Sequence, residues 1–120
     1  MNKSKNNKNV KIVFSPEAKA FQKGLSEKAQ KKLDTVINRT KEGIQGEWFK
    51  KLSDTDGIYE FSADADNHFY RLFAFWDKED KNNTLIVCTH GISKKSNKTP
   101  AAAKEKAEKM KKEWFAAKSQ

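Results

Sequence analysis

The amino-acid sequence predicts an α+β domain, in which a small antiparallel sheet packs against a helical hairpin and a C-terminal helix. Residues 58–90 contain apolar runs of strand length separated by short turn signals, which is typical of an antiparallel meander. Residues 15–44 contain two helix-start signals, each followed by apolar residues at helical spacing. A further helical pattern follows Pro100, and an N-terminal strand completes the order β-α-α-β-β-β-α.

Length and composition agree with one folded domain. The 120 residues are enough to bury a modest core, and 36% of them are hydrophobic. We expect a basic, disordered tail over residues 1–9 and a single domain over residues 10–118. Cys88 is the single cysteine, so no disulfide can form within the chain. No apolar stretch reaches the ~18 residues of a membrane span or matches a signal peptide. We therefore expect a cytoplasmic protein without a membrane partner.

The N-terminal third is predicted to be a strand followed by two helices. Residues 10–14 are strand formers, and residues 15–17 supply a serine cap, a first-turn proline and a first-turn acid. That helix should end near Gly24. Ser26 caps a longer second helix, closed by glycines, whose apolar side contains Ala29, Leu33, Val36 or Ile37, Thr40 and Ile44.

The middle of the chain is predicted to form the sheet. Residues 48–52 form an amphipathic link into a turn signal at 54–57. Strands are expected over 58–65, 68–76 and 84–90. The second of these has apolar residues on both faces, so both faces should be at least partly covered.

A lysine-rich loop is expected after the last strand. The apolar character stops at Gly91, and Thr99 is the expected N-cap of the next helix, with Pro100 at its first position. An ordered strand thus delivers His90 to its exposed end, followed by three loop lysines: Lys94, Lys95 and Lys98. This arrangement suits the binding of a polyanion.

Charge is unevenly distributed along the chain, whose net charge is +9. Residues 1–53 hold 13 Lys/Arg against 5 Asp/Glu, residues 54–80 hold 2 against 8, and residues 91–120 hold 9 against 3. Folding can gather the two basic segments on one face, which indicates a nucleic-acid partner. For charge alone, a solvated lysine surface is an equally good explanation.

Arg71 is the one charged residue inside the central strand, and two interpretations fit it. It can pair with an acid on the neighbouring strand, such as Glu60 or Asp64, or it can hold a phosphate. The basic context favours the phosphate.

Several motifs resemble the phage-derived HigB-like branch of the RelE/ParE toxin superfamily. They are Gly57-Ile58-Tyr59-Glu60, Tyr70-Arg71, the segment from His90 to Lys95, and Lys98-Thr99-Pro100. The Trp48–Leu52 segment also fits, so the resemblance covers roughly residues 10–115. It implies a RelE-like fold, with two helices against a small antiparallel sheet and a C-terminal helix.

The resemblance also implies an activity. The best-known members are toxins of type II toxin–antitoxin pairs that cut messenger RNA, usually on the ribosome, and a cognate antitoxin neutralises them. A ribose 2′-OH attacks the adjacent phosphate, which needs a base, an acid and cations for the phosphoryl oxygens. No metal or other cofactor is implied.

Site residues follow from the same resemblance. Arg71 matches the sheet arginine that stabilises the phosphate, and the following basic segment matches residues that contact the RNA backbone: Lys94, Lys95 and Lys98. His90 is near the position of a histidine general acid, and its unperturbed pKa suits that task. It fits equally well as a strand-end histidine bonded to a backbone carbonyl.

The remaining candidates are weaker. Glu47 is near the position of a glutamate base, although a plain surface role fits it better. Lys50 and Lys51 lie in the matching Trp48–Leu52 segment and are candidate RNA contacts. Tyr70 can stack on a base or simply pack in the core.

One departure bears on activity. The family commonly continues Leu-Arg after the Tyr-Glu pair, whereas this chain has Phe61-Ser62. Glu60 and Ser62 also stand where RelE has catalytic lysines. The chain is therefore expected to be a weak nuclease or to rely more on its loop lysines. Two alternatives stay open: a ParE-like toxin that inhibits DNA gyrase by binding, and a basic RNA-binding domain without activity.

Overall fold

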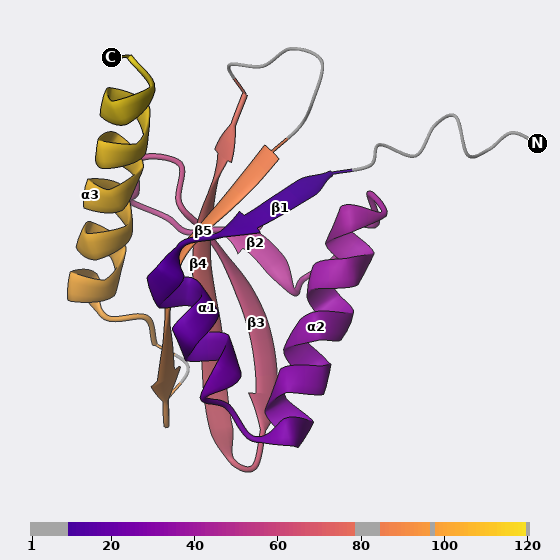
Figure 1. Ribbon diagram of the computed structural model, residues 1–120. Helices are drawn as coiled ribbons and strands as arrows, with labels where there is room; N and C mark the ends of the chain where they lie inside the picture. The colour runs from indigo at the N-terminus through magenta and orange to yellow at the C-terminus, as the bar shows by residue number, and fades with distance from the viewer. Residues whose placement is uncertain (1–9, 79–84, 97, 120) are drawn as a thin grey trace, which may run out of the picture.

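A five-stranded sheet with helices on both faces forms the protein (Figure 1). The computed structural model describes residues 10–78, 85–96 and 98–119. The elements in chain order are β1 (Lys11–Phe14), α1 (Pro16–Lys23), α2 (Glu27–Lys41), β2 (Phe49–Lys51), β3 (Tyr59–Ala65), β4 (His68–Asp77), β5 (Leu85–Lys94) and α3 (Ala101–Lys118). The predicted α+β class with its helical hairpin and C-terminal helix is confirmed. The tail over residues 1–9 lies outside the described residues.

Local signals start both helices of the hairpin, as predicted. The Ser15 hydroxyl accepts a hydrogen bond from Ala18 N at 3.0 Å, and the Ser26 hydroxyl accepts one from Ala29 N at 3.2 Å. Each serine satisfies an N–H group that the first helical turn leaves without an intrahelical partner.

The sheet is mixed rather than wholly antiparallel. Its strand order is β1-β5-β4-β3-β2, and β1 pairs with β5 in parallel, with Ile12 opposite Ile86. The other pairs are antiparallel. The segment predicted as an amphipathic link is the edge strand β2, which pairs with β3. A run of three residues is too short to show a period of two, so only its pairing partner makes it a strand.

The last strand is also longer than predicted. It continues past Gly91 to Lys94, because these residues pair with β4 as far as Phe69. Lys94 therefore lies on the sheet and not in a loop. Thr99 is not the N-cap of α3: Pro100 occupies that position, without a side-chain cap bond.

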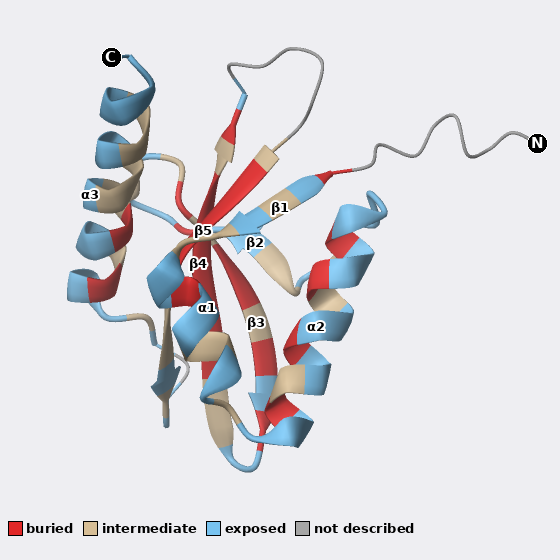
Figure 2. Ribbon diagram, viewed as in Figure 1, coloured by how far each residue is buried: buried red, intermediate tan, exposed pale blue. Residues whose placement is uncertain are grey.

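The two faces of the sheet bury separate apolar clusters. Figure 2 shows the buried residues along the central strands and on the helices that pack against them. The cluster between the sheet and the hairpin of α1 and α2 contains Leu33, Ile37, Phe61, Leu72, Ile86 and Cys88. The cluster between the sheet and α3 contains Ile58, Phe73, Phe75, Val87, Ala103 and Ala107. Residues 72–75 of β4 therefore alternate between the two cores, which confirms that both faces of this strand are covered.

Two features fix how the helices sit on the sheet. An ideal Cβ at Gly91 would lie 2.2 Å from the ring of Phe21, so the missing side chain lets α1 approach β5 closely. On the other face, the carboxylate of Asp77 is 1% exposed and accepts bonds from Trp114 Nε1 at 2.8 Å and Lys118 Nζ at 2.6 Å. These two contacts to Asp77 hold the C-terminal half of α3 against the end of β4.

Candidate functional site: an arginine–carboxylate network

The strand register gathers polar residues on the face of the sheet that α3 packs against. Residues directly opposite each other in an antiparallel pair share a face. Lys50 on the edge strand lies opposite Glu60. Asp64 and Lys94 pair with the same residue of β4, two positions before Arg71. These side chains thus extend along the sheet from the level of Phe73, under α3, towards the β3–β4 hairpin.

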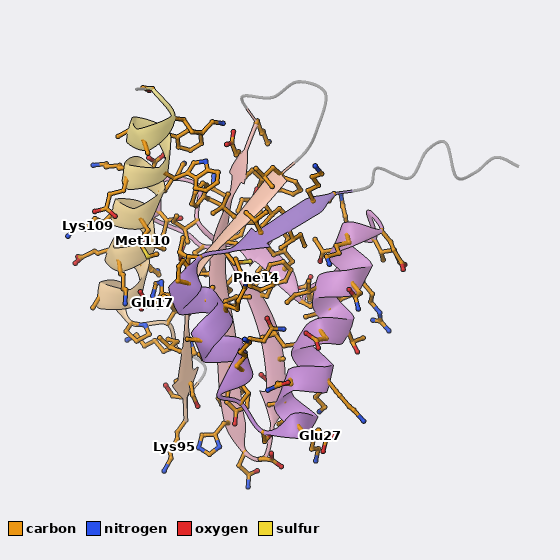
Figure 3. All side chains as sticks on the ribbon, viewed as in Figure 1. Phe14, Glu17, Glu27, Lys95, Lys109 and Met110 are labelled. Atoms are coloured by element: carbon orange, nitrogen blue, oxygen red, sulfur yellow. The ribbon has the colours of Figure 1, made fainter. Side chains whose placement is uncertain are left out.

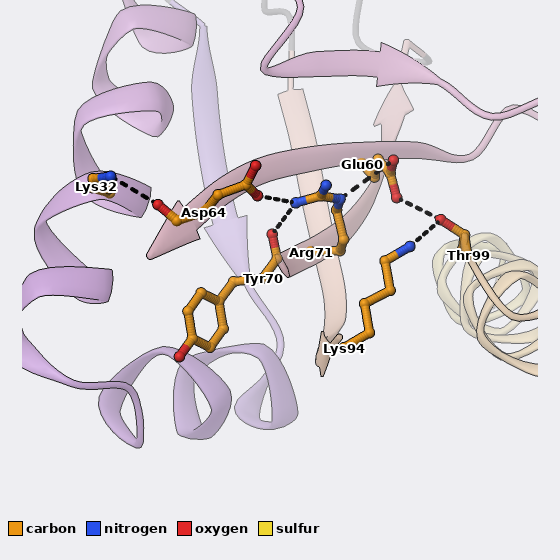
Figure 4. A network of polar contacts seen from close by, with 7 residues as sticks. All are labelled: Lys32, Glu60, Asp64, Tyr70, Arg71, Lys94 and Thr99. Atoms are coloured by element: carbon orange, nitrogen blue, oxygen red, sulfur yellow. Dashed lines mark hydrogen bonds and ion pairs between the residues drawn. The ribbon is translucent and has the colours of Figure 1, made fainter. Parts of the chain in front are cut away.

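Arg71 is the centre of this group and is only 4% exposed. Its Nη1 donates hydrogen bonds to Asp64 Oδ1 and to the carbonyl oxygen of Tyr70, both at 2.9 Å (Figure 4). Its Nε lies 3.8 Å from Glu60 Oε2, and its guanidinium lies 5.4 Å from the centre of the Phe69 ring. The acid pairing that the sequence left open for Arg71 is therefore present, and both candidate acids take part.

A threonine joins this arginine–carboxylate pair to a lysine. Glu60 Oε1 accepts a hydrogen bond from the Thr99 hydroxyl at 3.2 Å, and that hydroxyl accepts one from Lys94 Nζ at 2.9 Å (Figure 4). Burial lowers the pKa of Lys94, and the nearby Arg71 charge lowers it further, while Glu60 opposes the shift. We call these five residues the Arg71 network: Glu60, Asp64, Arg71, Lys94 and Thr99.

The two carboxylates of the network differ in exposure and in the number of their partners. The Glu60 side chain is 7% exposed and is held by Thr99 as well as Arg71, whereas the Asp64 side chain is 58% exposed. An anion from solvent can therefore replace Asp64 more easily than Glu60. Because a guanidinium presents its donors as a planar fork, the position at Nη1 suits a phosphate oxygen.

His90 lies on the same face but is buried apart from this network. It is 3% exposed, its ring centre is 4.9 Å from that of Phe73, and its Nδ1 lies 3.1 Å from the Thr89 hydroxyl. Nε2 is buried and has no partner among the described residues. Burial lowers the pKa of His90 to about 4, and Lys106 adds to the shift while Glu17 opposes it. The imidazole is therefore neutral near pH 7.

A bulge in β5 sets this position. Phe73 pairs with His90 while Ala74 pairs with Cys88, so Thr89 is the extra residue in the strand. The bond of the histidine is to a neighbouring hydroxyl rather than to a backbone carbonyl.

The other predicted residues are dispersed. Tyr70 is buried on the opposite face of the sheet, with Ala29 and Ala65 under the helical hairpin. Lys51 pairs with Tyr59 and so points to that opposite face, while its neighbour Lys50 shares the face of Glu60. Exposed positions beyond the network are occupied by Glu47, before β2, and by Lys95 and Lys98, after β5 (Figure 3 shows Lys95).

Sequence reasoning placed Arg71 and Lys94 in one site, and the structure brings them together. It missed Thr99 as a linking hydroxyl, because the Thr-Pro pair matched a helix cap. Thr99 belongs to the Lys98-Thr99-Pro100 motif and lies five residues after Lys94, and this short separation was the signal that could have linked them.

Within the described part of the chain, no group of three or more His, Cys, Asp or Glu residues could hold a metal ion. No helix among those residues has the length and hydropathy to cross a membrane.

The architecture and the comparison with protein families together indicate the class of protein. A helical hairpin on one face of a small sheet and a C-terminal helix on the other, with a central-strand arginine, are compatible with a RelE-like fold. The chain belongs to the phage-derived Gp49-like family (DUF891), whose model matches residues 20–112. This family is associated with RelE-like toxins, which is consistent with a toxin of a toxin–antitoxin pair and implies a cognate antitoxin as partner. A comparison with curated proteins finds no match.

Proposed function

We propose that this protein is a HigB-like toxin of a type II toxin–antitoxin pair and that it cleaves messenger RNA on the ribosome without a metal ion. The observation that supports this most is the Arg71 network. It holds a guanidinium in a fixed orientation beside a lysine of lowered pKa, on one face of the sheet. The family membership supports the toxin class but not the chemistry.

In the proposed reaction the ribose 2′-oxygen forms a bond to phosphorus as the bond to the 5′-oxygen breaks. The products are a 2′,3′-cyclic phosphate and a free 5′-hydroxyl. Arg71 stabilises the charge that develops on the phosphoryl oxygens, which enter where Asp64 is now bonded. Lys50, Lys95 and Lys98, all exposed, contact neighbouring phosphates as point charges.

Lys94 is the proposed proton carrier. Its lowered pKa makes the neutral amine more accessible than in an ordinary lysine, so the amine can accept the 2′-hydroxyl proton, and the ammonium that forms then returns a proton to the departing 5′-oxygen. His90 is left out of this mechanism, because a buried imidazole with a pKa of about 4 holds no extra proton at neutral pH. The role of Glu47 as a base stays a prediction, and its exposed position before the edge strand neither requires nor forbids it.

A second function is favoured by one specific observation. Asp64 and Glu60 already occupy the guanidinium of Arg71, and the histidine is neutral. This arrangement also suits a domain that binds RNA without cutting it, with the antitoxin or another partner as its regulator.

Cell-free translation followed by primer extension on the reporter mRNA separates these functions. We expect the wild-type protein to produce cuts within translated codons, and Lys94→Gln to lose them. Lys109→Gln is the matched control, because it removes the same charge from an exposed position on α3 (Figure 3). Arg71→Lys removes the planar fork of donors but keeps a positive charge beside Glu60. A neutral residue at this position would leave Glu60 as an unpaired buried charge, which costs about 3–5 kcal/mol.

Each outcome has a distinct meaning. Intact mRNA with arrested translation would support RNA binding without cleavage. Intact mRNA with normal translation, from a protein shown to be folded by circular dichroism, would refute the proposed cleavage and make gyrase inhibition the next test.

A further inference from the structure

Three aromatic side chains form a partly exposed surface at the end of the sheet far from the β3–β4 hairpin. Phe49, Tyr59 and Trp76 come from β2, β3 and β4, and each is partly exposed. The Phe49 and Tyr59 rings are stacked with their centres 5.0 Å apart, and Trp76 stands edge-on to both, at 6.1 Å and 6.4 Å. We call this group the Trp76 surface. The rings hold one another in place, so their orientation is fixed before any ligand arrives.

Two adjoining hollows open on this surface. One has a volume of about 910 Å³ and lies between the C-terminal end of α2 and the edge strand. The other has a volume of about 540 Å³ and lies between the edge strand and α3. Lys51, Tyr59 and Trp76 line both, so the two aromatic rings and one ammonium group stand on the ridge between them.

The rim of these hollows is mostly positive. Lys50, Lys51, Lys78 and Lys111 line them, against Glu47. The Lys78 ammonium lies 5.9 Å from the centre of the Trp76 ring. Lys111 is partly neutralised, because its Nζ lies 3.7 Å from Asp56 Oδ1 and donates to the Asp56 carbonyl at 2.7 Å. The other described lysines of the rim have no ion pair within 4.0 Å to a described acid.

This surface is separate from the Arg71 network. Trp76 is five residues along β4 from Arg71, which corresponds to ~17 Å of strand. An odd number of positions also places the two side chains on opposite faces of the sheet. Apart from Lys50, which lines one hollow and shares the face of Glu60, a ligand at the Trp76 surface therefore contacts different atoms from one at Arg71.

We infer that the Trp76 surface binds an unpaired nucleic-acid strand, with a base against the Tyr59 and Trp76 rings and its phosphates against Lys51 and Lys78. Proteins bind single strands by combining aromatic stacking platforms with a positively charged track. Both parts are present here, in contact with each other. The inference does not depend on the proposed cleavage, because it concerns a second surface and an uncut ligand.

The charge and the geometry favour this occupant over an acidic protein segment. An acidic segment would be attracted to the same lysines but would gain nothing from rings whose planes are preset. An apolar segment would be opposed by the ring of lysines, which would have to be desolvated on docking.

Fluorescence anisotropy with a short labelled oligouridylate tests the inference on the full chain. We expect Trp76→Leu to weaken binding about 5- to 150-fold, since stacking on one base is worth ~1–3 kcal/mol. Trp76→Phe, which keeps an aromatic ring, should retain most of the affinity. Lys78→Gln should lower the slope of log affinity against log salt by about one, whereas the equally charged change Lys109→Gln on the exposed side of α3 should not.

Three further arms decide what is bound. An abasic strand of equal length should bind weakly and equally to wild type and Trp76→Leu, because it has phosphates but no bases. An oligodeoxyuridylate arm distinguishes DNA from RNA as the source of the strand. A strand with 4-thiouridine should cross-link, on irradiation, to peptides containing Tyr59 or Trp76.

Several results would overturn the inference. One is that wild type and folded Trp76→Leu bind the oligonucleotide with equal affinity. Another is that Trp76→Leu loses as much affinity for the abasic strand as for the strand with bases. A third is that polyglutamate binds more strongly than the oligonucleotide. Cross-links confined to the Arg71 network would also overturn it, while leaving the proposed function intact. Conversely, a Trp76-dependent strand complex in a protein that cuts no mRNA would refute the proposed cleavage alone.

Discussion

Asp64 should act as a built-in competitor for the anion that Arg71 is proposed to hold. Its carboxylate accepts from Arg71 Nη1 at 2.9 Å, while Glu60 holds the Nε side. The substitution Asp64→Asn keeps the size of the side chain and removes its charge. A phosphate oxygen then replaces a neutral amide rather than a carboxylate, and we expect RNA to bind more tightly.

The magnitude follows from the exposure of the two partners. A charge-assisted hydrogen bond contributes ~1.5–3 kcal/mol when it is shielded from water, and an exposed ion pair ~0.2–1 kcal/mol. The Arg71 side chain is 5% exposed but that of Asp64 is 58% exposed, so the contact lies between these limits. A value of about 0.5–1.5 kcal/mol corresponds to binding that is about 2- to 10-fold tighter. The free energy of unfolding should fall by a similar amount.

The assay is equilibrium binding of a 2′-O-methyl oligonucleotide, which cannot be cut, at one fixed salt concentration. Asp66→Asn is a matched control in the adjacent turn, because it changes the net charge equally and alters only two long contacts, one with Lys28 Nζ at 3.7 Å and one from the Ser26 hydroxyl at 3.4 Å. Asparagine also tolerates the positive φ of 54° at that position.

The comparison can refute the reasoning directly. If both variants tighten binding equally, the effect is general electrostatics and Asp64 is no competitor. If Asp64→Asn weakens binding, the carboxylate orients Arg71 for the ligand instead of blocking it.

Three other changes test the packing around the site. Asp77→Ala should lower the free energy of unfolding by about 1–3 kcal/mol, because Trp114 loses its buried acceptor. An unchanged midpoint of unfolding in urea would show that the contacts to Asp77 do not stabilise the packing of α3. His90→Gln should make the free energy of unfolding depend less on pH between pH 6.5 and about 4. Burial lowers the pKa of His90 from 6.5 to about 4, so between these two values the unfolded chain binds a proton that the folded protein does not. The stability of the wild type therefore falls as the pH falls through this range, and the variant should lack this contribution. Equal slopes of unfolding free energy against pH would refute this. Gly91→Ala should cost about 1–3 kcal/mol through overlap with a ring of α1, whereas Gly24→Ala, whose added carbon meets nothing closer than 3.5 Å, should be neutral or slightly stabilising; equal shifts of Tm would count against this.

Elements whose signal is local were predictable. Ser15 and Ser26 begin helices because the hydroxyl and the N–H it caps are three residues apart, so sequence spacing alone decides whether they meet. The central strand was predictable for a related reason. Its apolar residues occupy both faces, and a strand with two apolar faces must lie between two covering layers.

Pairing partners were not predictable in the same way. The edge strand β2 is three residues long, and it is a strand only because β3 lies beside it. Residues 91–94 belong to β5 because β4 extends far enough to pair with them. The parallel pairing of β1 with β5 depends on where the helical hairpin returns the chain, which no short window of sequence records.

The candidate site divides in the same way. The sequence by itself determined the α+β class, the caps of the two hairpin helices, the central position of Arg71 and the excess of lysine around it. Only the tertiary structure decided that Arg71 is held by Asp64 and Glu60, and that Thr99 links this pair to a lysine. It also decided that His90 is buried and neutral near pH 7. The physical reason is that charge state and availability depend on burial and on partners far away in sequence, such as Thr99 and Glu60, which are 39 residues apart; these partners are fixed only when the strands pair and the helices pack.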